Sequence, residues 1–365
     1  EAVEKGHARS KEYLDESGAN VLLWGTALRA AGQVVPHMYW TVSERVSRAH
    51  ECEKYPIVPT DLSLPQIFWD DLNEVLQLLV VSGQQQFESR KGRYTADSLY
   101  PFIERVRNLF NGPQPGWSQK DSLQVTFMLS NALVQYGHQK GNDQPLLEAI
   151  ENYSRLLNRI TIEEAPLNWA LLQRSLGRAL TVIGEREGGT ARLEEAVAAF
   201  DEALKVRSLK QVHFDWASTQ CNRATALARM GEREDGTARL AEAASAFREA
   251  LNERSREHDS LEWAKNQNDL GTVLTSWGER EEGTARFEEA VIAFRAAIGV
   301  FSSRQVTLYL AASQDNLGNA LSAIGERRRD TACLKEAVRA YREALKEGTR
   351  ERVPLDWAIT QNNLC

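Results

Sequence analysis

Apolar residues recur at steps of three and four along most of the chain after residue 117. One such run holds Trp169, Leu176 and Leu180, and the next holds Leu193 and Phe200. Steps of three and four place side chains on one face of an α-helix, so each run predicts a helix. A pair of helices with one apolar stripe each cannot bury both stripes alone. Neighbouring pairs must therefore stack against one another.

The two-helix pattern repeats with a period of 47 residues. Each unit has a large apolar residue near its start, a Gly-Glu-Arg segment in its middle and an aromatic residue in its second helix. The residues in register are Trp169, Trp216, Trp263, Leu310 and Trp357, then Gly184, Gly231, Gly278 and Gly325, then Phe200, Phe247, Phe294 and Tyr341. The spacing predicts four units over 165–351, a degenerate unit over 118–164 and a truncated fifth unit over 352–365.

Individual residues also predict where the helices of a unit end. We expect the first helix to end at the repeated glycine, here Gly184, because glycine adopts a left-handed C-terminal cap at little cost. We expect the second helix to begin after Thr190, whose hydroxyl can accept a hydrogen bond from a backbone N–H group. The repeated tryptophans are expected to lie in the core between units.

The fourth unit carries a recognisable packing pattern. Residues 316–321 read Asn-Leu-Gly-Asn-Ala-Leu, and residues 334–345 read Leu-Lys-Glu-Ala-Val-Arg-Ala-Tyr-Arg-Glu-Ala-Leu. Small residues such as Gly318 and Ala337 alternate with large ones such as Tyr341, and this arrangement resembles a tetratricopeptide repeat. The resemblance implies a mainly α fold, namely a right-handed α-solenoid of helix pairs. The unit is longer than the usual repeat of about 34 residues.

The same resemblance implies a concave groove that is lined by the first helices and binds partner proteins or peptides. Carried over position by position, the groove residues are Arg174, Arg178, Cys221, Thr225, Asn268, Thr272, Asp315 and Asn319. These residues are polar and differ between units, whereas the core positions are nearly constant. In the second unit Arg223 and Ala224 replace the packing leucine and glycine. Arg223 is expected either to distort the repeat locally or to contact a ligand.

Two polar motifs repeat in register as well. The glutamines are Gln173, Gln220, Gln267, Gln314 and Gln361, and each lies in an apolar stripe where an unpaired amide is costly. We expect these glutamines to form a structural ladder between units, with a direct ligand contact as the alternative. The Glu-Arg pair after each repeated glycine predicts a charge ladder between units or a solvated loop, with a docking site as the alternative.

Residues 1–117 do not repeat and predict a small α/β and helical region. We expect a helix over 2–17, strands over 20–28 and 34–43 joined by a turn with Gly32, helices over 64–89 and 94–110, and a linker over 111–116. One helix and two strands make half of a small α/β domain, so the domain is expected to begin upstream of Glu1. Residues 18–25, Gly-Ala-Asn-Val-Leu-Leu-Trp-Gly, resemble small α/β modules of bacterial signalling proteins.

Composition narrows the classes of function. The net charge is -7, so the chain lacks the basic excess that binding to nucleic acid or anionic membranes needs, and no apolar run is long enough to cross a bilayer. The four cysteines form no close pair for zinc or a disulfide framework, which is typical of a reduced cytoplasmic protein. His50 and Cys52 lie in an acidic stretch that favours an ordinary polar segment over a catalytic pair.

The sequence therefore predicts a non-enzymatic scaffold or sensor arm that binds a partner protein or peptide in the groove. We expect it to belong to a larger bacterial signalling or effector protein and to need no metal or cofactor. One alternative is self-assembly into dimers or filaments through the uncapped C-terminal unit. A second alternative is an enzyme whose site lies in residues 1–117.

Overall fold

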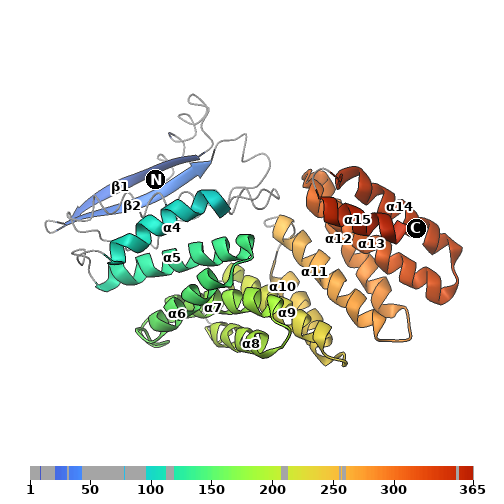
Figure 1. The fold of residues 1–365 in the computed structure, drawn as a ribbon, viewed down its shortest axis with the longest axis horizontal. Coiled ribbons are helices and arrows are strands. Elements are labelled where there is room, and N and C mark those ends of the chain that lie inside the picture. Colours follow the sequence, from blue (N-terminus) through green and yellow to red (C-terminus); the bar gives the residue numbers. More distant parts are fainter. Residues whose placement is uncertain are drawn as a thin grey trace. The chain divides into compact units, whose positions relative to one another are not determined.

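The structure is a computed structural model of the chain, which forms two compact units, Glu1–Asn152 and Tyr153–Cys365 (Figure 1). The residues that it describes are 9, 21–30, 33–42, 78, 96–111, 119–206, 213–254, 256, 260–350 and 353–364. Apart from Arg9 and Leu78, the helices predicted over 2–17 and 64–89 lie outside the described residues, as do His50, Cys52 and most of the linker over 111–116.

The first unit contains a β-hairpin. Strand β1 (Val21–Ala30) pairs antiparallel with β2 (Gln33–Val42), so that Val21 lies opposite Val42 and Ala30 opposite Gln33 (Figure 1). Aromatic and β-branched residues favour this extended backbone, and the two predicted strands are confirmed. Pro36 lies opposite Ala27, and a proline is tolerated here because a strand of a two-stranded sheet has an unpaired edge.

Helices α4 (Ala96–Asn111), α5 (Gln119–Lys140) and α6 (Asp143–Leu157) follow. The buried residues of α4 are Ala96, Leu99, Ile103 and Val106; 47 residues after the last three, α6 has the buried Leu146, the half-buried Ile150 and the buried Tyr153. Arg107 of α4 also forms an ion pair with Glu148 of α6, with 2.6 Å between Nη2 and Oε2. Helix α4 thus has the pattern of a second helix of the repeat, although we predicted it to belong to the N-terminal region.

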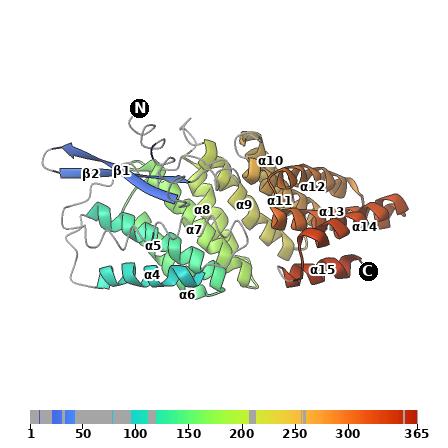
Figure 2. The same ribbon diagram turned by 90° about the horizontal axis from the view of Figure 1, so that it is seen from above.

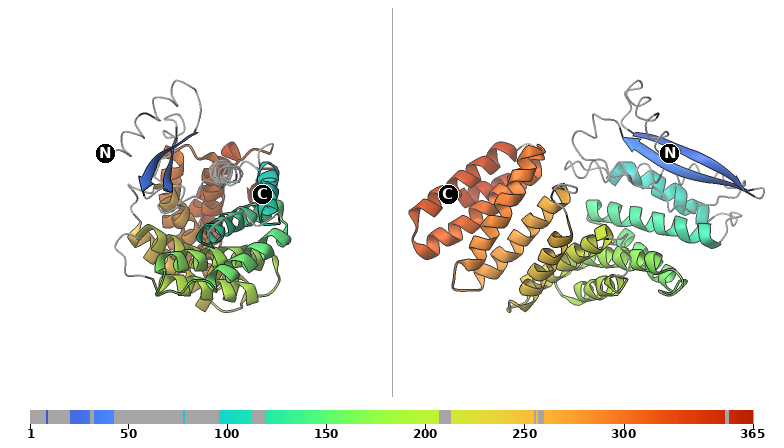
Figure 3. Two further views of the ribbon diagram at one scale, coloured as in Figure 1. Left: turned by 90° about the vertical axis from the view of Figure 1, so that its left-hand side faces the viewer. Right: turned by 180° about the vertical axis from the view of Figure 1, so that it is seen from behind.

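The second unit is a series of helix pairs that lie side by side in chain order (Figures 2 and 3). The first helices of the pairs are α7 (Pro166–Arg186), α9 (His213–Arg233), α11 (Ser260–Glu279), α13 (Thr307–Arg328) and α15 (Pro354–Leu364). The second helices are α8 (Ala191–Leu204), α10 (Ala238–Glu253), α12 (Ala285–Ser303) and α14 (Thr331–Glu347). Successive first helices begin 47 residues apart. This architecture is the expected α-solenoid.

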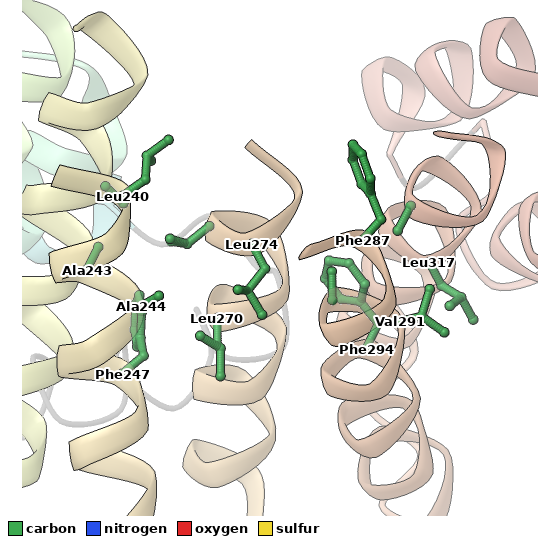
Figure 4. Packing of buried hydrophobic residues seen from close by; sticks show 14 of the residues in the cluster. Leu240, Ala243, Ala244, Phe247, Leu270, Leu274, Phe287, Val291, Phe294 and Leu317 are labelled. Atoms are coloured by element: carbon green, nitrogen blue, oxygen red, sulfur yellow. The ribbon is translucent and has the colours of Figure 1, made fainter. Parts of the chain in front are cut away.

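One apolar core runs through α9–α14 (Figure 4). Leu270 and Leu274 of α11 lie between the Phe247 side of α10 and the Phe294 side of α12 (Figure 4). Phe247 and Phe294 are almost completely buried. Because each helix contacts its neighbours in the series, the stack buries the stripes that a lone pair would leave exposed.

The repeated glycines act as contact points between helices and do not end them. Helix α7 continues through Gly184 to Arg186, and Glu187 after it is extended, so the predicted left-handed cap is wrong. Gly184 is buried, and a Cβ atom added to it would lie 2.9 Å from Cγ of Leu193. A second glycine of the same helix, Gly177, would in the same way place a Cβ atom 2.7 Å from the Phe200 ring. Both positions therefore favour a residue without a side chain, although Ala224 occupies the Gly177 position of the second repeat beside the buried Phe247.

Helix α8 begins after Thr190, as predicted, but the expected hydrogen bond from the threonine cap is absent. Thr190 precedes α8 with helical dihedral angles, φ -102° and ψ -10°, and its side chain accepts no capping bond. Its hydroxyl instead donates to Oε1 of Glu194 at 2.8 Å, and Thr284 donates to Glu288 at 3.0 Å. Only an extended residue directs its side chain back toward the backbone N–H groups. Asp330 before α14 is extended, and its carboxylate accepts from the amide of Ala332 at 2.8 Å.

The repeated Glu-Arg pairs connect neighbouring repeats, mainly through backbone carbonyls. Arg233 donates to the carbonyl of Gly189 at 2.5 Å, Arg280 to that of Gly236 at 2.5 Å, and Arg327 to that of Gly283 at 2.6 Å. Each of these carbonyls lies in the loop of the preceding repeat. An arginine carries several donors in a fixed plane and suits this bridging position. The expected connection between units is present, but its acceptors are main-chain oxygens.

Ion pairs link successive second helices and explain the unusual second repeat. Arg248 pairs with Glu289 at 2.5 Å, and Arg295 pairs with Glu336. The position equivalent to Arg248 in the preceding repeat is Asp201, which would face the acidic Glu242. Arg223 lies between these two carboxylates, with 2.5 Å to each. Arg223 therefore neutralises a local excess of negative charge.

The glycine contact yields a test of the packing. Gly177→Ala should lower the free energy of unfolding by about 1–3 kcal/mol, because the added methyl group overlaps the Phe200 ring. Gly299→Ala in α12 is the matched control, since a Cβ atom there meets nothing within 4 Å and alanine favours a helix by up to about 1 kcal/mol. Urea unfolding followed by circular dichroism measures both. A stabilising Gly177→Ala would contradict this description of the core.

Candidate protein-binding surface

The first helices form one layer of the second unit and the second helices form the other. From α7 to α15, each first helix comes close to the next first helix at several residues. In the described part of this unit, consecutive second helices lie farther apart. In a curved stack the more closely spaced layer is the inner one. The first helices therefore line the concave side, as the resemblance implies.

The eight predicted groove residues occupy different environments on this layer. Arg178 is exposed, and Arg174, Thr225, Thr272 and Asp315 are partly buried. The hydroxyls of Thr225 and Thr272 donate to the carbonyls four residues before them, at 3.0 and 3.2 Å. The remaining residues, Cys221, Asn268 and Asn319, lie in contacts between helices.

Asn268 and Asn319 connect neighbouring first helices. Oδ1 of Asn268 accepts from the Ser313 hydroxyl at 2.8 Å and from the Asn316 amide at 3.3 Å, both on α13. Oδ1 of Asn319 accepts from the Tyr341 hydroxyl at 2.9 Å and from the Asn363 amide at 3.1 Å. These bonds use the acceptors that a ligand would otherwise meet. Both asparagines therefore join helices of the layer.

Cys221 occupies in α9 the position of Asn268 in α11, and it is only 9% exposed. Burial raises the pKa of its thiol to about 12, so it stays protonated and is a poor acceptor. Asn266, the equivalent of Ser313, is buried in α11, and its Nδ2 has no hydrogen-bond partner. The polar contact between α11 and α13 is thus not reproduced between α9 and α11.

Asp269 is the residue of the open surface that the sequence pattern missed. It lies next to Asn268 on α11 and is exposed, and it accepts a hydrogen bond from the Asn268 amide at 3.3 Å. Water can reach its carboxylate, but the surrounding helices displace bulk water and raise the pKa of Asp269 to about 6. Consecutive residues of a helix point about 100° apart. Asp269 therefore lies on the open face, although Asn268 before it lies in the contact between helices.

The repeated glutamines and tryptophans surround the core. Gln220 donates to Glu249 of its own repeat at 3.0 Å, and no hydrogen bond joins two of the five glutamines in the described ranges. The predicted glutamine ladder is therefore not formed at Gln220. The four tryptophans of the grid are partly buried, and Trp263 packs beside Phe301, while the guanidinium of Arg256 lies 5.2 Å from its ring centre.

Comparison with known families supports the helix-pair geometry. The sequence model of the tetratricopeptide repeat family matches residues 310–351, which hold most of α13 and all of α14. The chain is a tetratricopeptide-like repeat protein. A search of curated proteins found no relative that matches the chain.

Solved structures with similarity to this tetratricopeptide-like chain include BtubC (BKLC) from P. vanneervenii, at 16% identity and a TM-score of 0.47, covering 70% of this chain and 92% of that one. A Rap protein complexed with competence and sporulation factor matches at 13% identity and a TM-score of 0.47, covering 82% of this chain and 80% of that one. MamA matches at 17% identity and a TM-score of 0.38, covering 59% and 93%.

The described residues of this tetratricopeptide-like protein indicate a binding surface and give no indication of catalysis. Within them, no group of three or more His, Cys, Asp or Glu residues is arranged to hold a metal ion. None of the helices described here is both long and apolar enough to span a bilayer. The layer of first helices, with its exposed charges, is the surface best suited to contact another molecule.

The interrupted contact at Cys221 yields a stability test. Cys221→Asn should raise the free energy of unfolding by about 0.5–1.5 kcal/mol, because the new amide oxygen can accept from the unpaired Asn266 Nδ2. Cys221→Ala, which provides no acceptor, is the control. Thermal unfolding of the three proteins compares them directly. If Cys221→Asn is less stable than Cys221→Ala, the two interfaces are not equivalent.

Proposed function

We propose that the open surface of the first helices binds an extended segment of a partner protein. A scaffold that binds other proteins agrees with the tetratricopeptide-like repeat. The main support is a contrast between the packing positions, which are nearly constant from repeat to repeat, and the surface positions, which vary. The residue that packs on the small position of the first helix is aromatic in every repeat, whereas the next position of the first helix, which is exposed or partly buried, is Arg178 in one repeat and Thr225 or Thr272 in the next two. Varied residues on a regular frame are suited to selective recognition.

This surface combines the accessible residues of the predicted groove with Asp269. Arg174, Arg178, Thr225 and Thr272 remain at least partly accessible, while Cys221 is buried and Asn268, Asn319 and Asp315 lie in contacts with the neighbouring first helix. The described part of this surface is polar, so hydrogen bonds and charge would determine which segments bind.

We also propose that the chain acts as the docking arm of a larger signalling or effector protein of bacterial type. The short resemblance of residues 18–25 to signalling modules supports this context, and a cytoplasmic location would fit the unpaired cysteines Cys221 and Cys333. The partner protein would then bring the attached activity to its site of action.

Capture of partners tests the proposed function. Asn222 is partly buried and occupies in α9 the position of Asp269 in α11. A variant with Arg178→Ala, Asn222→Ala and Asp269→Ala on the first helices should lose at least about nine tenths of the captured partner, because these side chains are at least partly accessible on that face. The matched control has Glu195→Ala, Arg339→Ala and Arg342→Ala, which are exposed on second helices. Equal helicity is verified by circular dichroism. If the control variant loses the captured partner and the first-helix variant keeps it, the proposal is refuted.

Self-association is a second candidate function, favoured by α15. Leu355 is 71% exposed and Ile359 is 48% exposed, and they lie on one face of that helix. Association through this face should give a mass that rises with concentration in light scattering, and Leu355→Lys with Ile359→Glu should abolish the rise, because charges there oppose burial. A constant monomer mass over the whole concentration range would exclude this function.

A further inference from the structure

The outer face of α14 has a stripe of basic residues. Its members, Lys335, Arg339, Arg342 and Lys346, follow one another at steps of four, three and four residues, and all are exposed. These steps place the four side chains on one face of the helix. At about 1.5 Å per residue, the stripe is about 16 Å long. Helix α14 therefore presents a row of positive charge on the layer of second helices.

This basic stripe is not part of the repeat pattern. The other second helices have different residues at the same four positions of their repeats. These are Glu194, Ala198, Asp201 and Lys205 in the repeat of α8; Ala241, Ser245, Arg248 and Asn252 in α10; and Glu288, Ile292, Arg295 and Gly299 in α12. Each of these rows has a single basic residue. Packing of the repeats therefore does not require the stripe of α14.

The arginines of this row in the two preceding helices are neutralised within the protein. Arg248 of α10 pairs with Glu289 of α12, with 2.5 Å between the nitrogen and the oxygen. In the same way, Arg295 of α12 pairs with Glu336 of α14. Both carboxylates come from the next helix of the same layer. A glutamate on a helix alongside is thus a suitable partner for a cation of this row.

Three cations of the stripe have no such partner. In the described part of the chain no ion pair involves Lys335, Arg339 or Arg342, whereas Lys346 pairs with Glu343 of its own helix. Nε of Arg339 donates to the carbonyl of Lys335 at 3.4 Å, and this neutral acceptor leaves the positive charge of the arginine uncompensated. Like charges three and four residues apart on a helix repel one another. An acidic ligand on this face would relieve the repulsion.

Helix stability alone does not account for Lys335. The equivalent residues of α8 and α12 are Glu194 and Glu288, and each accepts a hydrogen bond from the threonine that precedes its helix. A carboxylate near the N-terminus of a helix is stabilised by the helix dipole, and a lysine is not. Helix α14 thus has a cation where the local structure of the repeat favours an anion.

We infer that the basic stripe of α14 binds an acidic helix of a partner protein, with carboxylates at the same steps of four, three and four residues. The stripe lies on a second helix, so this inference goes beyond the proposed function and does not depend on it. The order of steps is the same in both directions, so the bound helix can run parallel or antiparallel to α14. A large polyanion would also meet the acidic residues of a chain whose net charge is -7, whereas a single helix covers the stripe alone.

Two synthetic peptides of equal composition test the inference. Both consist mainly of alanine and glutamine, which favour a helix, and both have four glutamates. In the striped peptide the glutamates follow at steps of four, three and four residues, and in the scattered peptide they are distributed around the helix. Fluorescence anisotropy at low salt should show the striped peptide binding about fivefold more tightly, and high salt should remove the difference. Equal affinities of the two peptides at low salt would overturn the inference.

Charge reversals give a matched comparison. Lys335→Glu with Arg339→Glu should weaken binding of the striped peptide at least about tenfold and remove the preference over the scattered peptide. The control is Arg159→Glu with Lys205→Glu, which changes the net charge equally at exposed residues outside α14 and should keep the preference. Circular dichroism verifies that both variants retain the helical signal. If the control weakens the striped peptide as much as the stripe variant does, net charge alone determines binding and the inference is wrong.

Two other anionic ligands are compared in the same assay. These are a short DNA duplex and vesicles of phosphatidylcholine and phosphatidylserine in equal parts. Both should bind more weakly than the striped peptide. If either binds more tightly and loses its binding in the stripe variant, the stripe recognises a polyanion and the assignment to an acidic helix is wrong.

The capture variants separate this inference from the proposed function. The control of the capture experiment contains Arg339→Ala and Arg342→Ala, so it should keep the partner of the first helices and lose the preference for the striped peptide. The first-helix variant should lose that partner and keep the preference. If the first-helix variant also loses the preference for the striped peptide, the peptide binds elsewhere and the inference is wrong. If the first-helix variant keeps its captured partner, the proposed function fails, and the peptide result still decides the inference.

Discussion

The close contact between a small residue of the first helix, glycine in three repeats and Ala224 in the second, and an aromatic side chain of the second helix determines the rest of the fold. Phe200 lies against Gly177, Phe294 against Gly271 and Tyr341 against Gly318. Each glycine lets the two helices approach closely enough to bury an aromatic ring, a contribution of about 2–3 kcal/mol. Because this contact fixes the spacing within a pair, it also sets the surface that the next pair meets. The stack depends on these contacts more than on any polar bond.

Where packing does not fix a residue, the repeats differ, and most differences are compensated. Arg223 replaces a packing leucine and neutralises Asp201 and Glu242. Cys221 replaces an asparagine and leaves the Nδ2 of Asn266 without a partner. By contrast, Arg178 and Asp269 have no ion-pair partner in the described part of the chain and are exposed. Exposed differences on a regular frame are the features from which a binding function was inferred.

The sequence predicted the helix pairs well, because burial of an apolar stripe imposes a period that can be read directly. A glycine in a sequence is typical both of a helix end and of a close contact between helices, and the pattern did not distinguish the two. Gly184 makes a close contact, because the absence of a side chain leaves room for Leu193. Thr190 was expected to cap α8, but that requires extended dihedral angles, which tertiary packing decides. Asn268 was expected to face the groove, but the position of the next helix, which the sequence does not give, places its side chain in a contact with α13.

Hydrogen exchange on the complex with the captured partner tests the central claim, that the layer of first helices is the binding surface. We expect slower exchange in α7, α9, α11 and α13 when the partner is bound, with the exposed faces of α8, α10, α12 and α14 unchanged. Slower exchange confined to the second helices would contradict it, because the partner would then lie on the opposite layer.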